Sequence, residues 1–170
     1  MKPVLFFFLV MVMASVTAQK PVSAKIAFKI KNMGITVDGT MEVTDLRFKQ
    51  PSADPATWTL EGTASPATIN TGIGIRDKHL KRSDYFDVEK FPVIRLASSR
   101  IKPNGRNKYE GTFTLTIKSI SKTATIPFTI SENGMTGEFT INRLDYGLGE
   151  KSAILSNDVK IKVTGVFSAR

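Results

Sequence analysis

The single histidine of the 170-residue chain, His79, lies among charged residues. Asp77 and Asp84 stand close enough in sequence to orient its imidazole, so a general base is one interpretation. The other interpretation is a surface histidine in a charged segment, which is the commoner situation for a lone histidine. Asp77 and Lys81 are four residues apart, and this spacing predicts an ordinary helical ion pair.

Metal and cofactor chemistry has little support in this composition. The chain has no Cys, which excludes thiolate zinc sites, iron–sulfur clusters and disulfides, and one His leaves multi-histidine metal sites without ligands. Gly72-Ile73-Gly74 begins like a phosphate-binding loop, but Asp77 occupies the place of the third glycine. The sequence also lacks a Gly-x-Ser-x-Gly elbow. We therefore predict no metal site, no cofactor and, as the first hypothesis, no catalytic residue.

The charge balance favours surface contacts over nucleic acid. Lys and Arg outnumber Asp and Glu by 24 to 15, a net charge of +9. These cations are mostly single lysines spread along predicted strands, so we expect no nucleic-acid partner. One hairpin, which is either a solvated loop or a peripheral contact with anionic lipid headgroups, is more strongly basic. It carries Arg95, Arg100, Lys102, Arg106 and Lys108.

Residues 1–18 are typical of a secretory signal. A positive N-terminus precedes an apolar run over residues 4–13, and Val16-Thr17-Ala18 provides the small residues that a signal peptidase requires. The run is too short to span a bilayer, which needs about 20 apolar residues. We expect cleavage after Ala18, one domain over residues 19–170, and a periplasmic or secreted location without an integral membrane span.

Past the signal, apolar and polar residues alternate with a period of two, which is typical of half-buried strands. Asn104-Gly105 and Asn133-Gly134 fall where hairpins need turns, and we expect type I′ turns there. Consecutive hairpins indicate an antiparallel meander. The alternating segments are residues 24–31, 35–44, 57–64, 94–96, 109–117, 124–130, 135–141 and 159–167.

Residues 71–89 interrupt this alternation. Ile75 and Leu80 are spaced so that they could share one side of a short helix, and Asn70 or Thr71 is available as its N-terminal cap. We predict a helix and a loop inserted between two strands.

About eight such strands must bury their apolar faces, as a sandwich or as a closed barrel, and closure removes the sheet edges. We predict an all-β fold, an antiparallel up-and-down extended barrel with a short inserted helix. Small inward residues either bend the strands or leave an open cavity; they are Gly39, Gly62, Ala64, Gly111, Gly137 and Gly165. The inward apolar side chains that would contact a ligand in such a cavity are Phe28, Ile30, Val37, Met41, Trp58, Leu60, Phe113, Leu115, Phe139, Ile141, Ile161 and Val163.

Four ordered stretches carry a resemblance to a known family. They are the first hairpin, with Phe28-Lys29-Ile30-Lys31 before Gly34 and Val37 and Gly39 after it, a central stretch over residues 69–94 that contains Arg76-Asp77-Lys78-His79-Leu80, the strand over residues 111–117, and residues 139–147 with Asn142-Arg143-Leu144-Asp145-Tyr146-Gly147. On these motifs the chain resembles the YceI-like family of exported lipid-binding proteins, over essentially its whole length past the signal.

The resemblance implies a lipocalin-like barrel whose apolar interior holds a polyisoprenoid or another long-chain amphiphile. It implies no catalytic residue, and it makes Arg76, Asp77 and His79 candidates for the mouth of the barrel. Asn32 stands where the family often has His, so the polar contacts at the mouth are where this chain departs from the family pattern.

We therefore expect an exported carrier or reservoir for a polyisoprenoid, quinone-like or fatty amphiphile that makes and breaks no bond. Two other hypotheses stay open. One is a lipid-modifying enzyme that uses His79 as its base, and the other is a structural barrel filled by its own side chains. A homodimer through exposed strands or the inserted helix is compatible with the sequence, although no motif specifies one.

Overall fold

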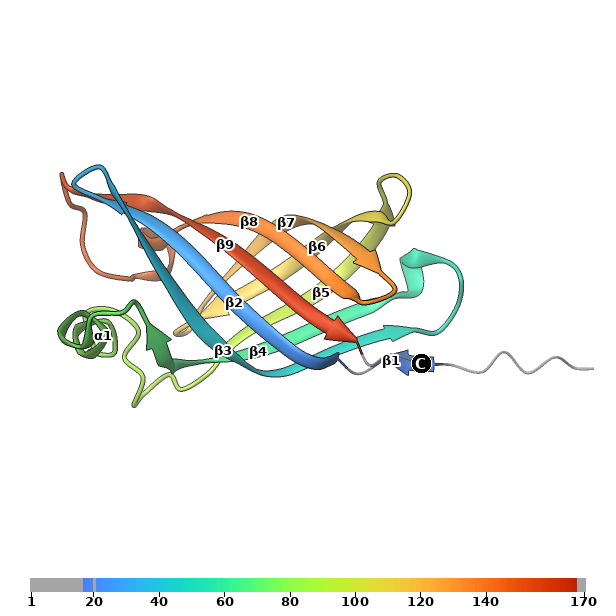
Figure 1. Ribbon diagram of the computed structural model, residues 1–170, viewed down its shortest axis with the longest axis horizontal. Coiled ribbons are helices and arrows are strands. Elements are labelled where there is room, and N and C mark those ends of the chain that lie inside the picture. Colours follow the sequence, from blue (N-terminus) through green and yellow to red (C-terminus); the bar gives the residue numbers. More distant parts are fainter. Residues whose placement is uncertain (1–16, 20, 168–170) are drawn as a thin grey trace, which may run out of the picture.

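Eight antiparallel strands, β2 to β9, pair in chain order and close into a barrel in the computed structural model, which describes residues 17–19 and 21–167 (Figure 1). Each strand pairs with the next along the chain, and β9 pairs with β2 to complete the barrel. A short strand, β1, extends the edge of β3. The predicted all-β, up-and-down antiparallel barrel with a short helix is confirmed. The elements are β1 (Thr17–Gln19), β2 (Pro21–Asn32), β3 (Ile35–Gln50), η1 (Pro55–Thr57), β4 (Thr59–Asn70), α1 (Gly74–Leu80), β5 (Ile94–Pro103), β6 (Lys108–Ile117), β7 (Ile120–Ser131), β8 (Gly134–Asn142), η2 (Arg143–Tyr146) and β9 (Leu155–Phe167).

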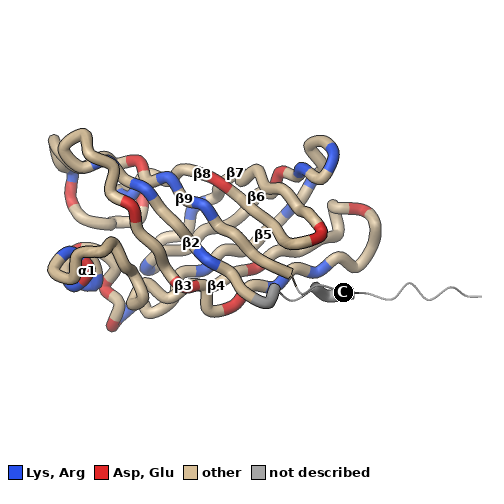
Figure 2. The backbone as a smooth tube through the Cα atoms, viewed as in Figure 1, with Lys and Arg blue, Asp and Glu red and all other residues tan. Residues whose placement is uncertain are grey.

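Burial along the strands follows the alternation of the sequence. In β6, Phe113, Leu115 and Ile117 are buried, whereas Thr114 between them is exposed. Successive side chains of a strand point to opposite faces, so one face of each strand fills or lines the barrel interior. Lys, Arg, Asp and Glu residues are spread along the strands and over the loops at both ends of the barrel (Figure 2).

The inserted helix is confirmed as α1, but its predicted cap is wrong. The N-cap is Ile73, which makes no side-chain cap hydrogen bond. The side chain of Asn70 instead accepts a hydrogen bond from the backbone N–H of Gly72, at 2.9 Å. Asn70 and Thr71 therefore shape the turn that leads into the helix.

The predicted apolar face of this helix is also wrong. Ile75 and Leu80 are five residues apart, which places them about 140° apart around a helix of 3.6 residues per turn. Ile75 is 85% exposed, whereas Leu80 packs against the core residues near Met41. The predicted ion pair between Asp77 and Lys81 is absent from the described residues, because the Asp77 carboxylate accepts hydrogen bonds from Thr71.

Hairpins occur at both predicted turns, but the predicted turn type is wrong. Neither Asn104 nor Asn133 is among the described residues with positive φ. The two-residue turn with positive φ at both positions lies between β2 and β3, at Met33 (φ 51°) and Gly34 (φ 79°). Both positions of a type I′ turn require positive φ.

The two ends of the barrel differ. At one end, here called the closed end, aromatic rings from neighbouring strands pack against one another inside the barrel. Trp58 contacts Phe48 and Tyr109 at centroid distances of 5.6 and 5.0 Å, and Phe128 contacts Tyr109 and Phe113 at 5.6 and 6.3 Å. The other end, here called the open end, carries the β2–β3 turn, α1 and the segment before β9, on the left of Figure 1.

Within residues 17–19 and 21–167, no helix has the length and apolar character to cross a membrane. The predicted signal over residues 1–18 lies almost entirely outside the described residues, and its cleavage stays a prediction.

Candidate functional site

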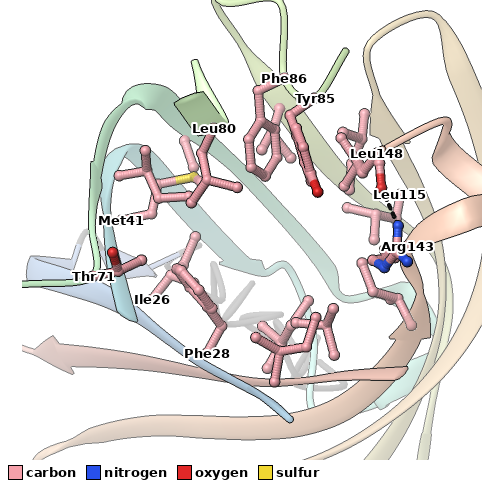
Figure 3. Close-up of a pocket in the computed structure, with 18 of the residues that line it drawn as sticks. Ile26, Phe28, Met41, Thr71, Leu80, Tyr85, Phe86, Leu115, Arg143 and Leu148 are labelled. Carbon is pink, nitrogen blue, oxygen red and sulfur yellow. Dashed lines mark hydrogen bonds between the residues drawn. The ribbon is translucent and has the colours of Figure 1, made fainter. Parts of the chain in front are cut away.

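A cavity of about 360 Å³ occupies the open end of the barrel (Figure 3). Isoleucine, valine and leucine side chains from every strand of the barrel except β7 line it, together with Leu80 of α1 and Phe86 of the segment that follows. The volume lies within the range of about 300–1,000 Å³ that is usual for small-molecule pockets. Nine of the twelve predicted contact residues line it: Phe28, Ile30, Val37, Met41, Leu115, Phe139, Ile141, Ile161 and Val163.

The other three predicted residues, Trp58, Leu60 and Phe113, do not line this cavity. Phe113 is 1% exposed and packs into the aromatic cluster of the closed end. Leu60 and Phe113 face a separate void of about 40 Å³, and the indole Nε1 of Trp58 donates to the carbonyl of Ser52 at 2.8 Å. Period-two alternation identifies the inward face of a strand but not the depth of a residue along the barrel, so it could not separate these three from the rest.

The small inward residues predicted from the sequence have different roles in the structure. Gly62 and Ala64 line the cavity. A Cβ at Gly39 would overlap the phenyl ring of Phe28, which lies directly across from it in the β2–β3 pair. This glycine therefore does not leave empty volume. It makes room for an aromatic ring to lie against the barrel wall.

Arg76 and His79 line the mouth of the cavity, whereas Asp77 does not. Arg76 donates from Nε to Thr71 Oγ1 at 2.7 Å and from Nη2 to the Thr71 carbonyl at 2.8 Å. Asp77 accepts from the Thr71 backbone N–H at 2.9 Å. Asp77 thus holds Thr71, and Thr71 in turn orients the Arg76 guanidinium at the cavity.

His79 and Asp84 form a hydrogen-bonded pair at the rim, with 2.7 Å between Nε2 and Oδ2. The hydrogen bond from His79 holds the pKa of Asp84 below its ordinary value. Both side chains are about half exposed. The His79 ring also meets Tyr85 edge-on, at a centroid distance of 5.1 Å. The pair therefore fixes the segment that follows α1 against the rim.

Arg143 is the charged residue that the sequence reasoning missed. It lines the cavity and is only 2% exposed. Its guanidinium donates to the carbonyl oxygens of Leu148 (2.7 Å), Glu150 (2.8 Å) and Ser156 (3.0 Å), as Figure 3 shows for Leu148. It thereby ties the segment before β9 to η2. Its membership of the Asn-Arg motif was the signal that could have identified it.

Two other polar groups line the open end, and of these the sequence reasoning missed Tyr85. Tyr85 directs its hydroxyl oxygen into the cavity (Figure 3). The Oδ1 atom of Asn32, another lining residue, is buried and has no hydrogen-bond partner among the described residues. A buried acceptor without a donor is costly, by about 1–3 kcal/mol. Asn32 thus leaves a carbonyl oxygen free to accept a hydrogen bond from a ligand.

The floor of the cavity is formed by residues that also face the small void below it. Leu46, Leu96, Phe139 and Val163 line both spaces. Leu46 extends over the intervening strand β2: a Cβ added at Gly165 of β9 would lie 2.9 Å from its Cδ2 atom. Leu46 therefore separates the cavity from the closed end.

The described part of the chain holds no group of three His, Cys, Asp or Glu side chains that could bind a metal ion. No Asp or Glu is among the residues that line the cavity. The site thus combines an apolar interior with a mouth that carries cationic and neutral polar groups.

An eight-stranded up-and-down barrel with an apolar cavity at one end is the architecture of barrels that enclose small ligands, as in lipocalins. More particularly, the chain belongs to the YceI-like family: the model of the YceI-like domain matches residues 18–167.

Individual relatives agree with this assignment. A UPF0312 protein from Pseudomonas savastanoi pv. phaseolicola is 27% identical over 153 residues, which cover 82% of this chain and 80% of the relative. The crystal structure of BcnA from Burkholderia cenocepacia matches with a TM-score of 0.77 at 27% identity, covering 85% of this chain and 96% of that one. A polyisoprenoid binding domain from Saccharophagus degradans shares the fold, with a TM-score of 0.65 at 12% identity and coverage of 90% and 98%.

Proposed function

We propose that the protein binds a long-chain amphiphile, with a polyisoprenoid as the first candidate, in the open-end cavity. One observation carries the proposal: a cavity of about 360 Å³ has an apolar interior and a polar mouth. This arrangement suits a molecule with a hydrocarbon chain and one polar end. The related domain from Saccharophagus degradans, described as polyisoprenoid binding, supports the isoprenoid class.

The energetics favour a long chain over a small solute. Transfer of a five-carbon isoprene unit from water gains at most about 4 kcal/mol, at about 0.8 kcal/mol per carbon. Binding costs about 4–15 kcal/mol in lost translational and rotational freedom, and more for immobilised side chains. Several buried units are therefore needed, and affinity should rise with the length of chain that the cavity admits.

The mouth favours a neutral or anionic polar end. Arg76 and Arg143 line the cavity and no carboxylate does, so a cationic headgroup would meet like charge. The unpartnered Oδ1 of Asn32 favours a group that can donate a hydrogen bond, such as an alcohol. Among amphiphiles of equal chain length, we expect alcohols and acids to bind more tightly than amines.

Binding without catalysis is the role that we assign, as a carrier or reservoir. The His79–Asp84 pair is the one feature that favours the enzyme alternative, because a carboxylate orients an imidazole beside the cavity. Lipid recovered with unchanged mass after prolonged incubation supports the binding role. A changed mass with the natural protein but not with His79→Ala would establish the enzyme instead.

Export is part of the proposal and rests on the signal-like residues 1–18. The intact mass of protein recovered from cells that express the full chain should show loss of 18 residues. A carrier of this kind must also contact membranes peripherally to load and unload its lipid. An intact mass that retains residues 1–18 would contradict the proposed export.

The experiment that tests the cavity assignment is a thermal melt with added geranylgeraniol. A ligand that binds only the native state raises the melting temperature. Ala64 lines the cavity and is 3% exposed, so Ala64→Phe should fill part of it and remove the shift. Ala97→Phe on the outer face of the neighbouring strand β5 is the matched control and should retain it. Equal shifts in the two variants would contradict the proposal.

A further inference from the structure

Exposed apolar side chains are concentrated around the mouth of the cavity. Five of the six large hydrophobic residues that are exposed in the described chain lie at the open end, with exposed fractions between 53% and 85%. They come from three separate segments, the β2–β3 turn, the start of α1 and the segment before β9, which project from the same end in Figure 1. They are Met33, Ile35, Ile73, Ile75 and Ile154.

These three segments, here called the rim, lie at the same end of the barrel beside the cavity. The backbone N–H of Met33 donates to the carbonyl of Ile154 at 2.8 Å, so two of the segments touch. Thr71 and Arg76, which flank Ile73 and Ile75 in sequence, line the cavity itself. Isolated exposed hydrophobic residues need no explanation, but a clustered apolar surface with a polar border marks an interaction site.

Cationic side chains accompany this rim. Residues 76–82 carry four Arg or Lys and one Asp. The two nearest carboxylates are engaged with other groups, Asp77 with Thr71 and Asp84 with His79. Lys78 is exposed and makes no ion pair among the described residues. The rim therefore presents free positive charge next to exposed isoleucines.

We infer that the open end docks onto a bilayer that contains anionic phospholipid, with the isoleucine rim in the interface and Lys78 and Lys81 at the headgroups. This combination is the one by which peripheral proteins bind membranes. The inference rests on the proposed function, because docking by the mouth lets a lipid pass between bilayer and cavity without crossing water.

A second copy of the chain fits this surface less well than a bilayer does. In a symmetric dimer the same patch faces itself. The Lys78 and Lys81 side chains of one copy would then approach those of the other, and like charges repel. The basic hairpin over residues 95–108 also fits less well than the rim, because it joins β5 to β6 at the closed end and its Lys102 is paired with Glu110 at 2.7 Å.

Vesicle flotation tests the inference with protein purified from cells that express the full chain. We expect binding to vesicles of phosphatidylcholine with about 30% phosphatidylglycerol, weaker binding to phosphatidylcholine alone, and loss of binding in high salt. Ile73→Ser combined with Ile75→Ser should lower the partition coefficient by about tenfold or more. Val166→Ser, at the remaining exposed apolar residue, is the matched control and should bind like the natural protein.

Two charge-reversal variants test the contribution of the lysines to membrane binding. Lys78→Glu combined with Lys81→Glu should abolish the preference for anionic vesicles, whereas Arg106→Glu in the basic hairpin should leave it unchanged. Vesicle binding that none of the rim variants alters would overturn the inference. So would a natural protein that ignores vesicles and instead forms a dimer, seen by sedimentation velocity, that the isoleucine variants dissociate.

Extraction of the same preparations separates this inference from the proposed function. An isoleucine variant that retains its lipid but no longer floats supports docking as a distinct step. A natural protein that floats through its isoleucines but binds no amphiphile overturns the proposed function and supports docking alone.

Discussion

The two ends of this barrel are built from the same strands but have different interiors. Along β6, Phe113 is packed into the closed end, while Leu115 and Ile117 line the cavity at the open end. At the closed end the ring of Phe128 on β7 contacts the rings of both Tyr109 and Phe113 on the neighbouring strand β6. At the open end Phe28 lies against the wall at Gly39, as Phe113 does at Gly111, but among the described residues no other aromatic ring packs on Phe28, which leaves the centre free.

This difference shows that the cavity depends on where the aromatic rings lie as well as on the presence of small residues. Tyr85 also lies against a glycine: a Cβ at Gly149 would be 2.6 Å from its Cζ atom. Dense packing of aromatic rings therefore stabilises the closed end, whereas the open end is less densely packed and contains the cavity.

The largest effect should come from matched truncations at the two ends. Phe113→Ala removes a fully buried ring and should destabilise the protein by about 3–5 kcal/mol. Phe139→Ala removes a ring that already borders the cavity, so we expect about half that loss. Urea unfolding of both variants measures the contrast. Equal losses would mean that the open end is as tightly packed as the closed end.

The next largest effect tests whether Leu46 forms the boundary between the cavity and the closed end. Leu46→Ala should join the cavity to the small void beneath it and admit about two more carbons, which would tighten the binding of longer alcohols by about 1.6 kcal/mol, or roughly 15-fold. Isothermal titration with linear alcohols of increasing length measures this shift. An unchanged optimal chain length would place the floor of the site elsewhere.

A smaller effect is expected at the polar mouth. Asn32→Leu removes a buried acceptor that lacks a donor, so the ligand-free protein should gain about 1 kcal/mol of stability. The same change should weaken the binding of an isoprenoid alcohol several-fold and leave the corresponding hydrocarbon unaffected. Thermal melts of the empty protein and titrations with both ligands provide the two measurements. Equal weakening for both ligands would exclude a polar contact with Asn32.

The smallest effect is a pH dependence at the rim. The hydrogen bond from His79 lowers the pKa of Asp84 below 3.8, so the folded state favours the ionised carboxylate. The resulting stability is fully present above pH 3.8 and is lost as the pH falls through the lower folded pKa. Asp84→Asn should therefore lose less stability than the natural protein between pH 5 and pH 3 in urea unfolding. If the free energy of unfolding fell with pH by the same amount in the two proteins, the His79–Asp84 hydrogen bond would not be the source of this pH dependence.

Most of the fold could be predicted from the sequence, because period-two alternation directly encodes which face of a strand is buried. The strands, their order and the inserted helix followed from it. The positions of the type I′ turns could not be predicted in this way. Met33 adopts positive φ although it is not Asn, Asp or Gly, whereas the usual residue preferences favoured Asn104-Gly105 and Asn133-Gly134. The predicted cap was wrong because Asn70 accepts from Gly72 in the turn before the helix, whereas Thr71 donates to the Asp77 side chain within it.

The candidate site was predictable by face but not by position along the barrel axis. Phe28 and Phe113 follow the same alternation, yet one lines the cavity and the other fills the closed end. Arg143 lies in η2, outside the alternating strands, so the period-two pattern could not assign it to the cavity. The rim of exposed isoleucines likewise depends on three distant segments meeting in space.

The most direct test of the central claim is organic extraction of the natural protein and of Ala64→Phe, each purified from cells that express the full chain, followed by mass spectrometry. We predict a stoichiometric long-chain amphiphile in the natural protein and none in Ala64→Phe. A natural protein that is empty and also refuses added isoprenoids would contradict the claim, as would equal amounts of lipid in the two proteins.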